Sequence, residues 1–262
     1  MSTATSTPVR EAAQRLLDAA RTGTPCPPVR DLIGATDVAT AYAVQQQQTE
    51  ARLAAGARIA GHKIGLTSAA VQRQLGVDSP DFGILFDDMD VSASDVVDLS
   101  RLLQPKVEAE VAFVLSADLD TDDLTPERVR AAVDYAVAAL EIVDSRIAGW
   151  DITLADTVAD NASSGLFVLG AEHITLDAAE PVDIVMAMTI DGEVASAGTG
   201  AACLGDPLAA LAWLARTARE FGRPLRAGQV VLSGALGPMV ALKPGLRVEA
   251  TLTGFGTVRM TS

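Results

Sequence analysis

The chain has 262 residues, of which 49% are hydrophobic and 21% charged, a composition typical of a globular protein that can bury one large core. Its formal net charge of -14 repels nucleic acid phosphates and anionic lipid headgroups, which excludes them as partners. The same charge repels an anionic substrate. A site for a carboxylic acid therefore requires a local cation, either a metal ion or a lysine.

Cysteine content and the start of the chain indicate a cytoplasmic protein. Cys26 and Cys203 are too few for a disulfide framework and lack the paired spacing of a zinc or redox motif. Met1 to Pro8 contains neither the basic region nor the apolar run of a secretory signal. The apolar stretches of the chain are short and interrupted by charge, unlike a membrane span.

The first part of the chain is helical in character. Val9 to Ala20 carries an apolar stripe at helical spacing, and Thr36 is a candidate cap for a long helix from Asp37 to Ala55. We therefore expect a helical N-terminal lobe over residues 1–56, followed by one continuous β-rich catalytic domain over residues 57–262.

The sequence pattern changes from helical to β-like and turn-rich after this lobe. Arg58 to Thr67 is β-like, Ser68 to Leu75 predicts a short helix, and Gly76 to Phe86 is turn-rich. A proline and a glycine flank Asp81 in this last segment and predict a loop, which suits a proton-transferring residue on a lid. An ordinary turn aspartate is the alternative.

Val107 to Leu115 alternates as a strand does, with apolar residues on one side and Glu108 and Glu110 on the other. A helix then begins at Thr125 and Pro126, and its apolar stripe continues to Leu140. Glu141 to Ile147 predicts another strand.

From Val182 onward the pattern is mostly β. Asp191-Gly192 between two apolar-rich runs predicts a hairpin turn, and one helix is expected from Asp206 to Phe221. Three further strands are expected at Val230 to Leu232, Arg247 to Leu252 and Thr257 to Met260.

Glu108 and Glu110 are a candidate metal chelate. Residues two apart in a strand project on the same side, so both carboxylates can converge on one hard divalent ion such as magnesium, which prefers oxygen ligands. Glu141 follows an apolar run, where a solvated side chain is less expected. The alternative is that the two glutamates decorate the wet face of a strand, and spacing alone favours it.

Lys63 lies among small and apolar residues, where burial would lower its pKa and let it act as an acid or base near neutrality. An ordinary strand-edge lysine is the alternative. The run Asp160 to Gly165 offers hydrogen-bonding groups that could orient a carboxylate, and a plain turn explains it equally well. His62 and His173 accompany no nucleophile or metal-ligand spacing, so we expect structural roles for both.

Six segments together resemble the 2-keto-4-pentenoate hydratase family, within the fumarylacetoacetate hydrolase superfamily. They follow the family's order over nearly the whole chain: Gly61 to Thr67, Gly76 to Gly83, Pro105 to Glu110, Leu140 to Arg146, Asp160 to Gly165 and Val231 to Gly237. The resemblance implies an α+β fold, with a mixed β roll or sandwich of the fumarylacetoacetate hydrolase C-terminal type and a helical N-terminal lobe.

The same resemblance assigns roles to residues. It implies that Glu108, Glu110 and Glu141 hold Mg²⁺ or Mn²⁺, and that Lys63 and Asp81 occupy the acid/base positions. It further implies that Ser163, with Asn161, orients the substrate.

The implied activity is a metal-dependent hydratase, which adds water to a 2-hydroxy-2,4-dienoate and gives a 4-hydroxy-2-oxo acid in aromatic or steroid ring catabolism. A 4-oxalocrotonate-type decarboxylase is the nearest alternative, followed by a hydrolase of diketo acids. A non-catalytic oxo-acid-binding or scaffold partner is the alternative from another class. The resemblance also implies a homo-oligomer, with possible association with a downstream aldolase or the sister decarboxylase.

Overall fold

The computed structural model describes residues 6–68, 72, 77 and 79–262. Apart from positions 68 and 72, the helix predicted from Ser68 to Leu75 lies outside them. The helices are α1 (Thr7–Thr22), α2 (Arg30–Ile33), α3 (Val38–Ala54), α5 (Pro126–Ala131), α6 (Leu154–Ala159) and α7 (Pro207–Glu220). The strands are β1 (Ile59–Gly65), β2 (Asp81–Phe86), β3 (Lys106–Leu115), β4 (Val133–Val143), β5 (Ser164–Leu169), β6 (Val185–Ile190), β7 (Glu193–Thr199), β8 (Val230–Leu232), β9 (Val240–Ala241), β10 (Arg247–Leu252) and β11 (Gly256–Thr261).

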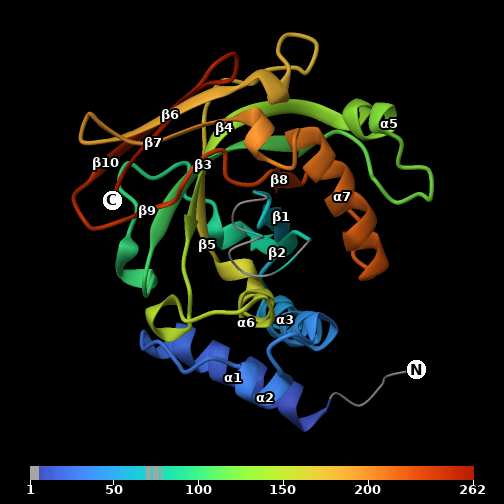
Figure 1. Ribbon diagram of the computed structural model, residues 1–262, viewed down its shortest axis with the longest axis vertical. Coiled ribbons are helices and arrows are strands. Elements are labelled where there is room, and N and C mark those ends of the chain that lie inside the picture. The colour runs from blue at the N-terminus through green and yellow to red at the C-terminus, as the bar shows by residue number, and fades with distance from the viewer. Residues whose placement is uncertain (1–5, 69–71, 73–76, 78) are drawn as a thin grey trace.

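These strands form two sheets. Within the described residues, seven strands make one sheet in the order β2-β1-β8-β3-β4-β5, with β9 paired to β3, and four make a second in the order β11-β10-β6-β7. The large sheet is mixed, because β1 runs parallel to β8 whereas its other named pairs are antiparallel. The small sheet packs through β10 and β11 against β4 (Figure 1). The prediction of an α+β fold with a mixed β architecture is confirmed.

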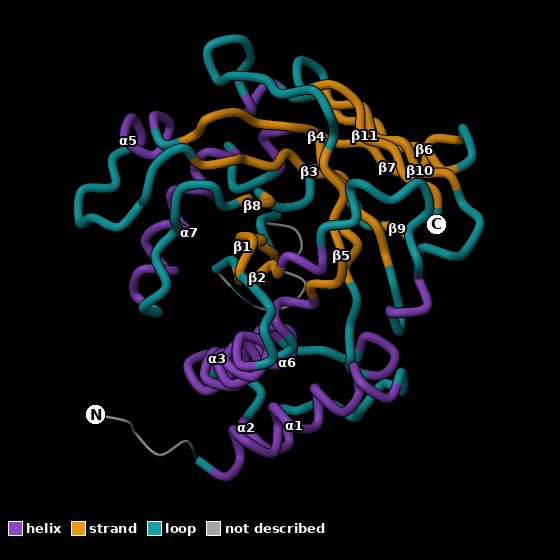
Figure 2. The backbone as a smooth tube through the Cα atoms, turned by 180° about the vertical axis from the view of Figure 1, so that it is seen from behind, coloured by secondary structure: helices purple, strands orange, loops and turns teal. Residues whose placement is uncertain are grey.

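A helical layer lies at one end of the molecule. Helices α1, α2, α3 and α6 gather there, well apart from the small sheet (Figure 2). Helix α6 belongs to the middle of the chain, so this layer includes residues from beyond position 56. The division of the chain at residue 56 stays a prediction. Among the described helices, none combines the length and apolarity needed to cross a membrane.

The cap of α3 differs from the prediction. The helix begins after Asp37, whose side chain accepts a hydrogen bond of 2.9 Å from the backbone N–H of Thr40, so the predicted cap at Thr36 is wrong. Aspartate caps a helix more strongly than threonine, and it lies one residue nearer the first apolar position. The predicted helix at 206–221 and the hairpin turn at 191–192 are confirmed by α7 and by the pairing of β6 with β7.

The helix predicted from Thr125 to Leu140 is wrong beyond its first turns. Helix α5 ends at Ala131, and β4 then runs from Val133 to Val143 between β3 and β5. From Ala136 onward every residue of β4 is buried, because both faces of the sheet are covered. A strand buried on both faces shows no alternation, and its continuous apolar run cannot be distinguished from a helix by spacing.

Gly61 allows β1 to approach β8 closely. A Cβ atom at this position would lie 1.8 Å from the carbonyl oxygen of Val230, which is far inside van der Waals contact. Since β1 carries Lys63 and β8 adjoins β3, this contact sets the distance between the lysine and the strand of Glu108.

We predict that Gly61→Ala lowers the free energy of unfolding by about 1–3 kcal/mol or more, because the added methyl group forces the strands apart. Urea unfolding measures the change. Gly170→Ala is the matched control, since its Cβ would come no closer than 3.0 Å to any atom and should cost less. Equal stabilities for the two variants would contradict the prediction.

Candidate metal centre

Three carboxylates converge on one face of the large sheet. The antiparallel register places Glu108 on β3 directly opposite Glu141 on β4, and Glu110 projects from β3 on the same side. One oxygen from each carboxylate lies within 4.8 Å of the other two. The spacing of two residues along β3 therefore does bring the glutamates together, and the third joins them across the strand pair.

Burial distinguishes this cluster from a wet strand face. Glu110 and Glu141 are 0% and 1% exposed, whereas Glu108 is half-buried. The backbone N–H of Gly234 donates to Glu110 Oε2 at 2.7 Å. Among the described residues, Glu110 Oε1 and Glu141 Oε2 accept no hydrogen bond.

This donor set fits a divalent cation. Buried carboxylate oxygens without partners are costly, and a hard ion such as Mg²⁺ would satisfy them with the oxygen ligands it prefers. Like charges directly opposite in a sheet also repel. Burial and the charge of Glu141 raise the pKa of Glu108 to about 7, and the same two causes raise the pKa of Glu110 well above its ordinary value. Lys63 opposes both shifts without cancelling them.

Lys63 is the cation that the chain itself supplies. It lies on β1, is 3% exposed, and places its Nζ 3.2 Å from Glu141 Oε1. Burial lowers the pKa of Lys63, but the carboxylates of Glu141, Asp81, Glu108 and Glu110 outweigh it and hold the pKa above its ordinary value. The prediction of a lowered pKa is therefore wrong, because the sequence did not show how many carboxylates surround the ammonium.

Asp81 is the first residue of β2, and the predicted loop at this position is wrong. Its backbone pairs with Gly65 across the β1–β2 ladder, and its side chain is buried, with Oδ1 accepting no hydrogen bond from the described residues. A Cβ atom at Gly65 would lie 2.2 Å from that oxygen, so the glycine makes room for the carboxyl group. Burial raises the pKa of Asp81, while Lys63 and a hydrogen bond from Thr157 lower it.

Asn161, Ala162 and Ser163 form a left-handed turn beside Asp81. Their φ angles are 54°, 51° and 53°, a conformation that costs non-glycine residues about 1–2 kcal/mol each. The Ser163 and Thr157 hydroxyls lie 3.2 Å apart. Thr157 thus links Ser163 to Asp81. Strain of this kind persists only where surrounding structure enforces it, and it clusters at functional sites.

The amide of Asn161 is engaged in the fold. Its Oδ1 accepts from the backbone N–H of Ile84 at 2.8 Å, and its Nδ2 donates to the carbonyl of the same residue at 2.9 Å. These bonds attach the left-handed turn to β2, the strand that begins with Asp81. Asn161 therefore holds the turn, whereas the Ser163 hydroxyl lies next to that of Thr157.

Two residues of this site were missed. Thr157 lies within α6, and no sequence spacing connects it with Asp81. Gly234 belongs to a segment that supported the family resemblance, but the backbone donation to Glu110 has no side-chain signal. His62 neighbours Lys63 in the chain yet lies with Phe82, at 6.3 Å between ring centroids, and burial lowers its pKa to about 4.

Comparison with known proteins places this site in a family. The fumarylacetoacetate hydrolase C-terminal family model matches residues 63–261. The chain is 54% identical to the 2-keto-4-pentenoate hydratase of Paraburkholderia xenovorans LB400, over 95% of this chain and 93% of that one. It is 52% identical to the TodF product hydratase of Pseudomonas putida F1, over 98% and 96% of the two chains.

A solved structure extends the likeness to three dimensions. The 4-oxalocrotonate decarboxylase of Pseudomonas putida G7, complexed with magnesium and adipate, superposes with a TM-score of 0.92 at 34% identity, covering 97% of this chain and 96% of that one. The family model, the hydratase relatives and the shared fold agree with one another. The chain therefore belongs to the fumarylacetoacetate hydrolase family and, within it, to the 2-keto-4-pentenoate hydratases.

Proposed function

We propose that this chain is a metal-dependent hydratase that converts a 2-hydroxy-2,4-dienoate of the 2-oxopent-4-enoate type into a 4-hydroxy-2-oxo acid. The observation that carries the proposal is the convergence of Glu108, Glu110 and Glu141 beside Lys63, in a chain 54% identical to a hydratase. Such dienoates arise in the opening of aromatic or steroid rings, which is the catabolic setting we infer.

Glu108, Glu110 and Glu141 would hold the metal, which we propose to be Mg²⁺ with Mn²⁺ as its substitute. All three offer carboxylate oxygens, the ligands both ions accept, and the magnesium complex of the related decarboxylase supports the first choice. When bound, the ion supplies Lewis-acid stabilisation of the negative charge that develops on the substrate's oxygens.

Lys63 and Asp81 are the proton-handling pair in this proposal. During hydration the dienol loses a hydroxyl proton, the far end of the carbon chain gains one, and water then adds across the resulting enone. The surrounding carboxylates keep Lys63 protonated, so its ammonium can donate a proton. Burial raises the pKa of Asp81, so its carboxyl group can exchange a proton close to Lys63. Both side chains are buried, so bulk water is kept from the ammonium and the carboxyl group.

Ser163 is proposed to orient the substrate, with Asn161 in support. The hydroxyl of Ser163 lies next to that of Thr157 and so close to Asp81. The amide of Asn161 fixes the turn that presents this hydroxyl. We assign Ser163 the direct contact and Asn161 a positioning role.

Decarboxylation of a 4-oxalocrotonate-type acid is the second candidate, because the magnesium-bound decarboxylase superposes so closely. Both reactions stabilise an enolate beside a metal. The identity of 54% to a hydratase against 34% to the decarboxylase favours hydration. A non-catalytic oxo-acid-binding or scaffold role is the third, and the buried Lys63–Glu141 pair argues against it.

We further propose a cytoplasmic homo-oligomer that works beside a downstream aldolase or the sister decarboxylase. Cys26 and Cys203 are both free and buried, which agrees with a reducing compartment. Association with the sister decarboxylase would pass the reactive dienol directly to this chain, and association with the aldolase would pass on the 4-hydroxy-2-oxo acid product.

The product distinguishes the candidates. With Mg²⁺ and a 2-hydroxydienoate, we predict loss of the dienol absorbance and formation of a 4-hydroxy-2-oxo acid, without release of carbon dioxide from a 4-oxalocrotonate-type acid. Parallel absorbance and carbon dioxide assays, each with and without a chelator, measure this. Carbon dioxide release as the faster reaction would assign the decarboxylase activity instead.

Replacing a metal ligand should remove both binding and turnover. We predict that Glu110→Gln lowers kcat/KM by about 1000-fold or more, because the neutral amide leaves the ion one charged ligand short. Mg²⁺ titration calorimetry should show the matching loss of affinity. Glu249→Gln, an exposed carboxylate on β10, is the control and should change neither quantity. Full chelator-insensitive activity of Glu110→Gln would refute the metal site.

Lys63→Ala should affect the chemical step more than substrate affinity. We predict a fall in kcat of about 100–10,000-fold, the range for loss of an acid/base group, with a much smaller change in KM. Lys243→Ala removes an exposed lysine and serves as the control. A raised KM with unchanged kcat would reassign Lys63 to substrate binding.

A further inference from the structure

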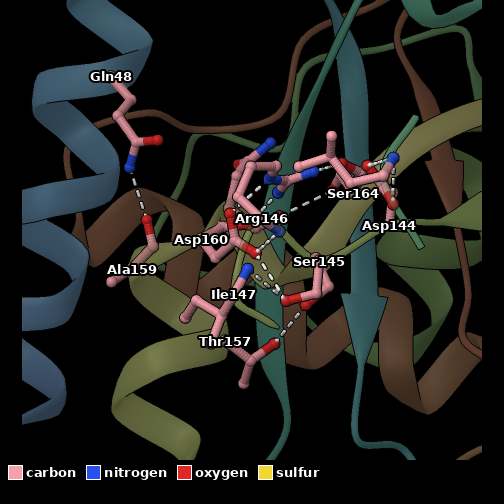
Figure 3. Close-up of polar contacts among 12 residues, drawn as sticks. Gln48, Asp144, Ser145, Arg146, Ile147, Thr157, Ala159, Asp160 and Ser164 are labelled. Atoms are coloured by element: carbon pink, nitrogen blue, oxygen red, sulfur yellow. Dashed lines mark hydrogen bonds and ion pairs between the residues drawn. The ribbon is translucent and has the colours of Figure 1, made fainter. Parts of the chain in front are cut away.

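The guanidinium group of Arg146 hydrogen-bonds to the residues on both sides of the left-handed turn at 161–163. Arg146 Nη2 donates to the carbonyl of Asp160 at 2.5 Å, and Nη1 donates to the carbonyl of Ser164 at 2.7 Å (Figure 3). These two carbonyls belong to the residues immediately before and after the turn. The planar fork of arginine fixes the distance between them in a way that a lysine ammonium cannot.

The side chain of Asp160 binds Arg146 as well. Its Oδ1 accepts from Arg146 Nε at 2.5 Å, and its Oδ2 accepts from the Arg146 backbone N–H at 2.9 Å and from Ser145 Oγ at 3.2 Å. Asp160 is 0% exposed, and its burial raises its pKa to about 6 although Arg146 opposes the shift. A buried ion pair gives little net stability, so this one calls for a local reason.

The strained turn supplies that reason. Three consecutive non-glycine residues with positive φ do not hold this shape by themselves. The backbone N–H of Asp144 also donates to the carbonyl of Ser163 at 2.8 Å, so the segment that follows β4 and includes Arg146 contacts the last residue of the turn as well. The turn is thus enforced from outside.

The turn is connected to Asp81 indirectly, through two other residues. Its Ser163 hydroxyl meets that of Thr157, which lowers the pKa of Asp81, and its Asn161 amide holds Ile84 of the strand that Asp81 begins. Arg146 makes none of these contacts itself. It can affect Asp81 only through the shape of the turn.

We propose that Arg146 and Asp160 are a positioning pair, which holds the left-handed turn so that Ser163 and Asn161 fix Asp81 for proton transfer. The inference rests on the proposed hydratase function for its catalytic consequence. The hydrogen bonds by which Arg146 holds the turn do not depend on that function. The structural role of Arg146 and its catalytic consequence can therefore be tested separately.

Arg146→Lys and Arg146→Ala test the proposal. In both, kcat for dienol hydration should fall about 10–100-fold, the size seen when a supporting contact behind a reactive group is lost, while KM and Mg²⁺ affinity stay within about threefold. Amide hydrogen exchange at Ile84 should become faster, because Asn161 Oδ1 no longer holds that N–H.

Chemical rescue separates positioning from general damage. Arg146 borders a cavity of about 200 Å³ whose walls include Arg52 and Leu166, large enough for a free guanidinium ion. Millimolar guanidinium should restore part of the kcat of Arg146→Ala and slow the exchange at Ile84 again. Arg130→Ala is the matched control, since Arg130 also pairs a carboxylate, that of Glu180, and a carbonyl, that of Leu176, and its loss should alter neither quantity.

Three results would decide against the proposal or its premise. Unchanged amide exchange at Ile84 in Arg146→Lys would show that Arg146 does not hold the turn, whatever the substrate. The positioning role also fails if kcat falls only in proportion to the loss of folded protein and guanidinium does not restore it. A wild-type protein that does not hydrate the dienol refutes the proposed function alone, and exchange at Ile84 still decides whether Arg146 holds the turn.

Discussion

Repulsion among buried carboxylates is the constraint on which the structure depends. Glu108 and Glu141 face each other across a strand pair, Glu110 projects beside them, and Asp81 adds a fourth acidic group. The ammonium of Lys63 offsets only part of this charge. A fold that placed these groups together without function would lose stability, since buried like charges are among the least favourable arrangements in a protein. A divalent cation bound at the cluster, as proposed above, would offset this repulsion.

Rigid strands hold this unfavourable arrangement in place. Strand β4 is buried on both faces, β3 is hydrogen-bonded on both sides, and β1 is fixed against β8 by the missing side chain at Gly61. Side chains on such strands keep their geometry better than side chains on loops, which suits ligands that must converge within a few ångströms. The turn at 161–163 places three consecutive left-handed residues next to these strands, and hydrogen bonds impose its shape.

Local patterns predicted the regular elements, and long-range neighbours explain what the sequence could not show. The alternation around Glu108 and the capped stripe of α7 are local, so both predictions are confirmed. Residues 133–140 of β4 were wrongly predicted as a helix because double-sided burial removes the alternation. The pKa of Lys63 was wrong because Glu141 and Asp81 approach it from other strands. The roles of the site residues stay predictions, and Thr157 had no sequence signal at all.

The parallel pairing of β1 with β8 has a consequence for how the protein is made. Lys63 lies in the first quarter of the chain, and its strand pairs with nearby β2 on one side but with residues 230–232 on the other, while the backbone donor to Glu110 is Gly234. A ribosome must therefore synthesise most of the polypeptide before the acidic cluster can close. Until then the nascent chain carries unpaired glutamates in water, where they are well solvated. Under the proposed function, metal binding would follow the pairing of β1 with β8.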